Sequence, residues 1–153
     1  MKGNRSFPKR RKSASPFVQL LGRVKQKRST TEHDEQVSFI SWARAVEGQH
    51  PELRLLYAIP NGGFRSVKTA VAMKAEGVRR GIPDIHFPCP KADKGLCGMW
   101  IEMKATSTGR LSAAQKEVHE NLRAIGYQVV VAYTAIEAIK SICEYMDWDN
   151  GFS

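Results

Sequence analysis

Apolar residues recur along this chain at two spacings, which predict an alternation of helices and strands. Over residues 31–47, Val37, Ile40 and Ala43 follow one another at intervals of three, which places them on one face of a helix. Over residues 127–133 the apolar residues form a nearly continuous run, which is typical of a strand buried at the centre of a sheet. The chain therefore combines helical and strand-like segments.

Clusters of proline and glycine separate these segments. The clusters at residues 60–63, 81–83 and 88–98 predict turns or loops, and glycines 77 and 126 end the helical segments before them. The expected elements are helices over residues 31–47, 67–77, 112–125 and 134–145, and strands over residues 53–59, 84–87, 99–105 and 127–133. The second and third strands follow each other closely, which predicts a hairpin. This order predicts an α/β domain with a central mixed sheet of about four strands, flanked by helices.

Hydroxyl residues mark the starts of the predicted helices. The first helix has two possible capping boxes, in which Ser29 pairs with Glu32 or Thr31 pairs with Asp34. The third helix begins after Ser112, which we expect to be its cap.

Composition narrows the class of protein. The chain has 153 residues, of which 42% are hydrophobic, enough to bury the core of one domain. Its apolar runs are far shorter than the roughly 20 residues of a transmembrane helix, so we expect no membrane span. The three cysteines lack the paired spacing of a disulfide scaffold. A reducing cytoplasm is therefore the expected compartment.

The positive charge of the chain is concentrated at one end. The net charge is +9, but residues 1–31 alone carry ten Lys or Arg and no acid. The rest holds 14 of the 24 basic residues and all 15 acidic ones, a net charge of −1. We expect residues 1–29 to be a disordered basic arm, residues 30–148 the folded domain and residues 149–153 a tail. The arm, with Arg10, Arg11 and Lys12, fits either nucleic-acid binding or a solubilising or targeting tail.

Three charged residues on the hairpin are candidates for chemistry. Glu102 and Lys104 point to the same side of their strand, because side chains alternate along a strand. The hairpin can bring Asp84 beside them. Two converging carboxylates repel each other unless a cation lies between them, and oxygen ligands suit Mg²⁺ or Mn²⁺. The alternative is that Glu102 and Lys104 form a solvated ion pair, which is common and contributes little to stability.

Several motifs in chain order strengthen the first interpretation. They are Ile59-Pro60-Asn61-Gly62-Gly63, Glu76-Gly77, Gly81-Ile82-Pro83-Asp84, Ile101-Glu102-Met103-Lys104, Leu111-Ser112-x-x-Gln115 and Gly126-Tyr127. Together they resemble the VRR-NUC nuclease domain, a branch of the PD-(D/E)XK superfamily, over residues 31–145. The resemblance implies a restriction-endonuclease-like core and divalent-metal-dependent hydrolysis of DNA. Stand-alone members of the family, often phage-encoded, are similar to Holliday junction resolvases that act as dimers on branched DNA.

The resemblance also implies roles for individual residues. Asp84 and Glu102 match the carboxylates that hold Mg²⁺ or Mn²⁺, with the Met103 carbonyl beside them. Lys104 matches the catalytic lysine, and Gln115 matches a glutamine that supports the site from the following helix. One further glutamate on the first helix normally completes such a metal site.

Two glutamates could fill this last position. Glu32 and Glu35 are three residues apart and therefore share a face of the first helix. Glu32 is favoured, because Glu32-x-x-x-Gln36 resembles the opening pattern of the family. The glutamate that does not bind metal would instead interact favourably with the dipole of the helix.

Weaker candidates surround this set. Asn61, Gly62 and Arg65 could contact a DNA phosphate, although the same residues also fit an ordinary turn. Arg79 and Arg80 precede the metal-binding strand and are expected to contact the DNA backbone, although solvated arginines after a helix are also common. The histidines of the helices, His119 among them, are expected at the surface.

Two functions remain open on these grounds. The first is a metal-dependent DNA endonuclease, active in the cytoplasm of a bacterium or of a phage-infected cell. The second is a non-catalytic nucleic-acid-binding protein that keeps the fold and uses the arm for binding. The set of Asp84, Glu102 and Lys104 favours the first, since binding alone does not require carboxylates near phosphate.

Overall fold

The computed structural model describes residues 31–60, 67–105 and 109–148. The expected arm at residues 1–29 and the tail at residues 149–153 lie outside the described residues. So do six of the residues expected to bind DNA: Arg10, Arg11, Lys12, Asn61, Gly62 and Arg65.

Four helices and four strands make up the described part. The helices are α2 (Glu32–Val46), α3 (Val67–Ala75), α4 (Ala113–Ala124) and α5 (Ala135–Met146). The strands are β1 (Tyr57–Ala58), β2 (Ile85–Phe87), β3 (Gly98–Met103) and β4 (Tyr127–Ala132). Two short 3₁₀ helices, η1 (Pro51–Leu55) and η2 (Ala92–Lys94), lie in the connections. None of the described helices is long and apolar enough to cross a membrane.

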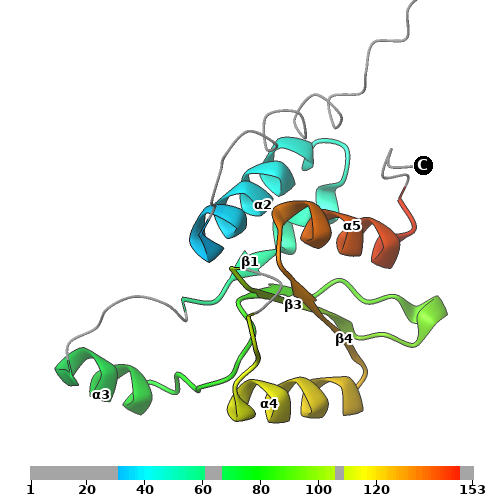
Figure 1. Cartoon of the computed structure of the whole chain (residues 1–153). Helices are drawn as coiled ribbons and strands as arrows, with labels where there is room; N and C mark the ends of the chain where they lie inside the picture. Colours follow the sequence, from blue (N-terminus) through cyan, green and yellow to red (C-terminus); the bar gives the residue numbers. More distant parts are fainter. Residues whose placement is uncertain (1–30, 61–66, 106–108, 149–153) are drawn as a thin grey trace, which may run out of the picture.

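The strands form one mixed sheet in the order β1-β2-β3-β4. β1 pairs with β2 and β2 with β3 in antiparallel fashion, whereas β3 and β4 run parallel. Helices α2 and α5 cover one face of this sheet and α4 covers the other, while α3 projects to the side (Figure 1). The expected α/β fold, with a central mixed sheet and a hairpin of β2 and β3, is confirmed.

The core decides which way the charged residues of β3 point. Phe39 of α2 and Ile139 of α5 are fully buried, as are Ile101 and Met103 on β3. Because side chains alternate along a strand, the residue between the last two, Glu102, points to the opposite face, towards α4. Burial of apolar side chains on one face therefore fixes the orientation of the carboxylate on the other.

Caps and glycines confirm most helix boundaries. Thr31 and Asp34 form the capping box of α2, which settles the choice between two caps. Ser112 caps α4, as expected. Beyond α3, Gly77 adopts a φ of 96°, in the left-handed region that favours glycine.

Two expectations about strands are wrong. Residues 53–59 do not form one strand, because Pro51 starts the 3₁₀ helix η1 and only Tyr57–Ala58 pair with β2. Proline favours the first turn of a helix, since its φ is already fixed near the helical value. Strand β4 is apolar but lies at an edge of the described sheet rather than at its centre. Its apolar run is explained by the helices on its two faces, α4 and α5.

Candidate active site

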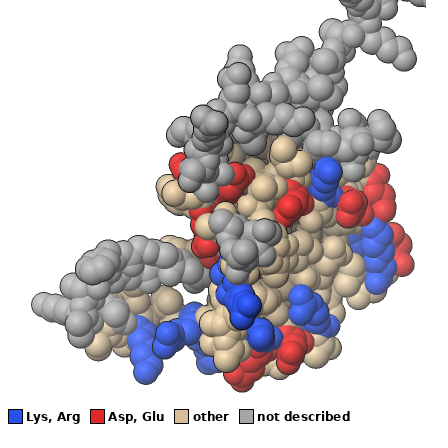
Figure 2. All heavy atoms as spheres, viewed as in Figure 1, with Lys and Arg blue, Asp and Glu red and all other residues tan. Residues whose placement is uncertain are grey.

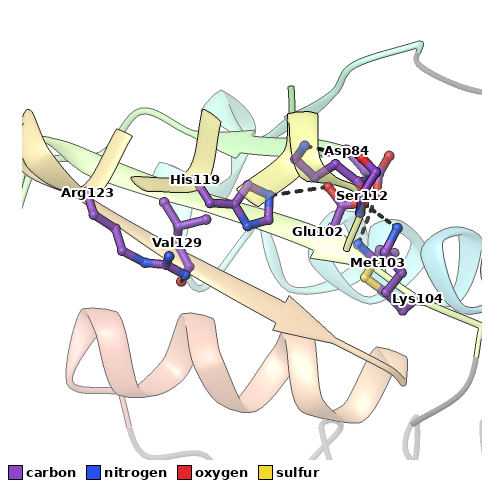
Figure 3. Close-up of polar contacts among 9 residues, drawn as sticks. Asp84, Glu102, Met103, Lys104, Ser112, His119, Arg123 and Val129 are labelled. Carbon is purple, nitrogen blue, oxygen red and sulfur yellow. Dashed lines mark hydrogen bonds and ion pairs between the residues drawn. The ribbon is translucent and has the colours of Figure 1, made fainter. Parts of the chain in front are cut away.

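The hairpin of β2 and β3 brings Asp84 to the charged end of β3. Asp84 precedes β2, and its Oδ2 accepts a hydrogen bond of 2.9 Å from the backbone N–H of Met103. This bond holds the Asp84 carboxylate beside Glu102 and Lys104, as Figure 3 shows. The convergence that the sequence suggested is therefore present.

Glu102 is a buried carboxylate rather than half of a solvated ion pair. Its side chain is 2% exposed and that of Lys104 is 13% exposed, and Lys104 Nζ lies 2.6 Å from Glu102 Oε1. The same oxygen also accepts a hydrogen bond from Gln115 Nε2. Burial, with Asp84 and Glu32 nearby, raises the pKa of Glu102 to about 7, although Lys104 opposes the shift. A carboxyl group with this pKa loses its proton near neutral pH, where a cation can take the place of the proton.

The ammonium group of Lys104 lies in the field of three carboxylates. Burial lowers its pKa, but the hydrogen bond to Glu102 and the charges of Glu102, Glu32 and Asp84 outweigh this effect and raise the pKa. Lys104 is therefore protonated. Its charge balances part of the negative potential at which a metal ion would bind.

A capping box orients the amide of Gln115. The Oε1 atom of Gln115 accepts a hydrogen bond of 2.9 Å from the backbone N–H of Ser112. The hydroxyl of Ser112 accepts a bond of 3.3 Å from the backbone N–H of Gln115. With its oxygen held by the start of α4, the amide must present its NH₂ group to Glu102.

The structure separates the two glutamates of α2. Glu35 is buried, and its Oε2 accepts a hydrogen bond of 2.7 Å from the backbone N–H of Ala135, at the start of α5. It thus ties α2 to α5. Glu32 instead acts electrostatically on both Glu102 and Lys104. Of the two glutamates of α2, Glu32 is therefore the one whose negative charge acts on Glu102 and Lys104.

A groove next to these residues carries basic side chains. It has a volume of about 1170 Å³ and is lined by Lys74, Arg79, Arg80, Asp84 and Gln115, among others. Figure 2 shows Lys and Arg side chains gathered over the segment between α3 and α4, whereas acidic side chains lie over α2. A groove with basic residues along it and a carboxylate in its wall is suited to a phosphate backbone.

The donor set of the site fits a hard divalent cation. Within residues 31–60, 67–105 and 109–148, no three His, Cys, Asp or Glu side chains are close enough to form a complete metal cluster. Mg²⁺ does not require one, because it is commonly held by one or two carboxylates together with water and substrate phosphates. Asp84 and Glu102 supply two carboxylates, and burial with the nearby charges of Asp84 and Glu32 raises the pKa of Glu102 even though Lys104 is its partner.

One buried residue of the site is not apparent from the sequence. His119, expected at the surface, is fully buried in α4 and lies 3.6 Å from Glu102. The expectation failed because histidine is polar, whereas the fold turns this side of α4 towards the sheet. Its spacing of four from Gln115, which places both on one face of the helix, is the signal that could have revealed it.

Comparisons with known proteins agree with this geometry. The VRR-NUC domain family matches residues 21–135. A solved structure described as a VRR_NUC domain protein is similar at 25% sequence identity and a TM-score of 0.66, over 80% of this chain and 96% of that chain. No curated protein matches the chain. The restriction-endonuclease-like core is consistent with the PD-(D/E)XK superfamily, and the domain indicates a nuclease-type function with a nucleic acid as partner. The chain belongs to the VRR-NUC domain family.

Proposed function

We propose that this protein is a divalent-metal-dependent endonuclease that hydrolyses DNA phosphodiesters. The observation that carries the proposal is the buried carboxylate of Glu102, 2.6 Å from Lys104 and beside Asp84. A buried charged pair contributes little to stability, because the cost of desolvation offsets the attraction. Its position beside a basic groove is explained if it serves catalysis.

Asp84, Glu102 and the Met103 carbonyl would hold Mg²⁺ or Mn²⁺ directly, and Glu32 would complete the set through a bound water molecule. Glu35 is the weaker candidate for this set, since its carboxylate already binds the start of α5. The bound ion would lower the pKa of a water molecule so that it can attack phosphorus. One or two ions are compatible with this donor set.

The residues of the chain itself bind and orient the substrate. Arg79 and Arg80, with Lys74, line the groove and would hold the DNA backbone by its phosphates. Lys104 is protonated and would position the attacking water or balance charge in the transition state. Gln115 holds Oε1 of Glu102 and thereby fixes the carboxylate in place.

Branched DNA, in particular a Holliday junction, is the substrate that we propose. Resolution of a junction requires two symmetric incisions and hence two sites, which a homodimer would supply. The cytoplasm of a bacterium or phage-infected cell is the proposed location, and the three free cysteines fit a reducing compartment. Sedimentation of the full-length chain, alone and with a four-way junction, tests the dimer: a monomer in both states would contradict it.

A cleavage panel tests the activity. Labelled four-way junction, flap, single-stranded and duplex DNA are incubated with the protein, with and without Mg²⁺ or Mn²⁺. We expect metal-dependent cleavage, strongest on branched DNA, that Asp84→Asn abolishes while DNA binding is kept. The matched control is Glu120→Gln, which removes an exposed carboxylate from α4 and should leave the rate unchanged. Binding without cleavage of any DNA would indicate a non-catalytic nucleic-acid-binding protein.

A further inference from the structure

His119 is a polar residue at a position where the fold calls for an apolar one. It is the buried side chain of α4, all of whose residues are described, and it is 0% exposed. Neither of its ring nitrogens has a hydrogen-bond partner among the described residues. Burying a polar group without a partner is unfavourable, because the group loses its hydrogen bonds to water and gains none in the protein. The histidine therefore requires an explanation other than packing.

The neighbour of His119 is the second oxygen of the Glu102 carboxylate. His119 Nε2 lies 3.6 Å from Glu102 Oε2, the contact drawn as a dashed line in Figure 3. Within the described part of the chain, Oε2 also lacks a hydrogen-bond partner. The other oxygen, Oε1, receives both Lys104 and Gln115. The face of α4 that carries Gln115 and His119 thus supplies one side chain to each oxygen of this carboxylate.

The ring of His119 can donate one hydrogen bond. Burial lowers its pKa, and the positive charges of Arg123 and Lys104 lower it further, which favours the uncharged ring. A neutral imidazole carries a proton on one nitrogen only. Of its two tautomers, the one with the proton on Nε2 can donate to Oε2 of Glu102. A shift of a few tenths of an ångström would bring the 3.6 Å contact to hydrogen-bond length.

We propose that His119 is a positioning residue of the nuclease site, which donates its Nε2 proton to Oε2 of Glu102 and thereby fixes the orientation of the carboxylate, with Oε1 held towards Lys104 and Gln115. Arg123, one turn further along α4, donates a hydrogen bond of 3.0 Å to the Val129 carbonyl and anchors the helix to β4. This bond fixes the position of α4 relative to β4, and with it the position of the His119 ring relative to Glu102. The catalytic consequence rests on the proposed function, whereas the contact itself does not.

The tautomer is the direct test, and it requires neither metal nor DNA. Long-range proton–nitrogen correlation spectra of ¹⁵N-histidine-labelled, metal-free protein at pH 8, above the pKa of about 7 of Glu102, distinguish a proton on Nε2 from one on Nδ1. The signal that disappears in His119→Gln assigns His119 among the four histidines. We expect the proton on Nε2. A proton on Nδ1 would overturn the proposal, whether or not the protein proves to be a nuclease.

Three substitutions test the consequence for the site. Glutamine places its amide nitrogen near the position of Nε2, asparagine places it near that of Nδ1, and leucine removes the donor. Loss of an outer partner of a metal ligand typically lowers metal affinity or activity about 10- to 100-fold. We expect that loss, in calorimetric Mn²⁺ affinity and in single-turnover rate, for His119→Leu and His119→Asn, with His119→Gln close to the wild type.

The outcomes separate this proposal from the proposed function. Equal Mn²⁺ affinity in the three variants and the wild type would overturn the role of His119. Equal losses in the glutamine and asparagine variants would also overturn it, since they would indicate a packing role. If the wild type cuts no DNA, the proposed function fails, while the tautomer and the Mn²⁺ titrations still decide the role of His119.

Discussion

At the scale of single residues, the burial of the charged side chains of Glu102 and Lys104 costs free energy. Both charges have lost most of their water, and their mutual attraction repays that loss only in part. Carboxylates that serve only stability are normally exposed or fully paired. The energetic cost at Glu102 favours binding of a cation, because the negative charges of Glu102, Asp84 and Glu32 outnumber the positive charge of Lys104.

The raised pKa of Glu102 predicts a metal effect that depends on pH. Without metal, the folded protein binds the Glu102 proton more tightly than the unfolded chain does, so stability falls as pH rises from 4.5 to about 7. Above this range the carboxylate is charged and free to bind Mn²⁺. At 100 times its dissociation constant, Mn²⁺ should stabilise the protein by about 2.7 kcal/mol. We expect this stabilisation near pH 8, and its progressive loss below about pH 7 as protons compete with the metal.

Thermal denaturation over a pH series, with Mn²⁺ or with a chelator, measures this effect. The control is Glu102→Gln, which should show neither the decline of metal-free stability with pH nor the stabilisation by Mn²⁺. The two pH values 5.5 and 8 lie below and above the pKa of Glu102, which is about 7. A Mn²⁺ stabilisation of equal size at both would contradict the assignment of Glu102 as a ligand.

Sequence predicts part of this site at the scale of residues. The alternation of side chains on a strand is a local property, and it correctly places Glu102 and Lys104 together. The roles of Glu32 and Glu35 depend on which helix lies against α2, which no local pattern encodes. Their spacing leaves both possible, and only the packing of α5 shows that Glu35 binds the backbone of Ala135.

At the scale of elements, the first turn of α4 both caps its own helix and contacts the site. Ser112 and Gln115 form the capping box of the helix, and the same Gln115 side chain reaches Glu102. The turn before β2 is fitted to this helix start: a Cβ on Gly81 would lie 2.5 Å from the Ala114 carbonyl oxygen, and its φ is 86°. Helix start and hairpin are therefore packed together closely, which holds Gln115 over the site.

Gln115→Glu separates the capping of α4 from the contact with Glu102. Glutamate forms a capping box as well as glutamine does, so the helix should remain capped. Its carboxylate would, however, replace the NH₂ group that faces Glu102, and a second negative charge raises the pKa of Glu102 further. We expect the rate of cleavage to rise with pH along a curve displaced to higher pH. Single-turnover rates over a pH series measure this displacement.

Ser112→Ala is the complementary control. It removes the capping hydroxyl and should cost about 1 kcal/mol of stability, while the backbone N–H that orients Gln115 remains. We expect a lower melting temperature and an unchanged pH profile. A displaced profile in Ser112→Ala, or an undisplaced one in Gln115→Glu, would contradict this division.

Sequence predicts elements best where their boundaries are set locally. Thr31, Ser112 and Thr134 each cap a helix through their own side chains, and the structure has helices at all three positions. The segment 53–59 is different, because a short apolar run fits a strand or a helical turn equally well. The position of β4 in the sheet could not be predicted either, since burial by two helices gives the same apolar run as burial between strands.

At the scale of the whole molecule, charge is divided unevenly between the two parts of the chain. Residues 1–31 carry ten basic residues and no acid, whereas the remaining residues have a net charge of −1. The basic residues of the groove are few, and acidic side chains lie over α2 on the same face (Figure 2). Most long-range attraction to DNA should therefore come from the first residues of the chain.

Deletion of residues 2–28 tests this division. It removes all ten basic residues of the segment, and the dependence of log K on log salt should flatten by about 0.9 for every DNA phosphate that the shortened chain no longer neutralises. We expect weaker binding to every DNA shape and a shallower salt dependence. Preference for a junction over a duplex should survive, because discrimination between shapes requires side chains at fixed positions, such as those of the groove and of a dimer. Binding of both proteins to a four-way junction and a matched duplex over a salt series measures both effects. Loss of the junction preference with an unchanged salt slope would assign shape recognition to the first residues of the chain and would refute the division.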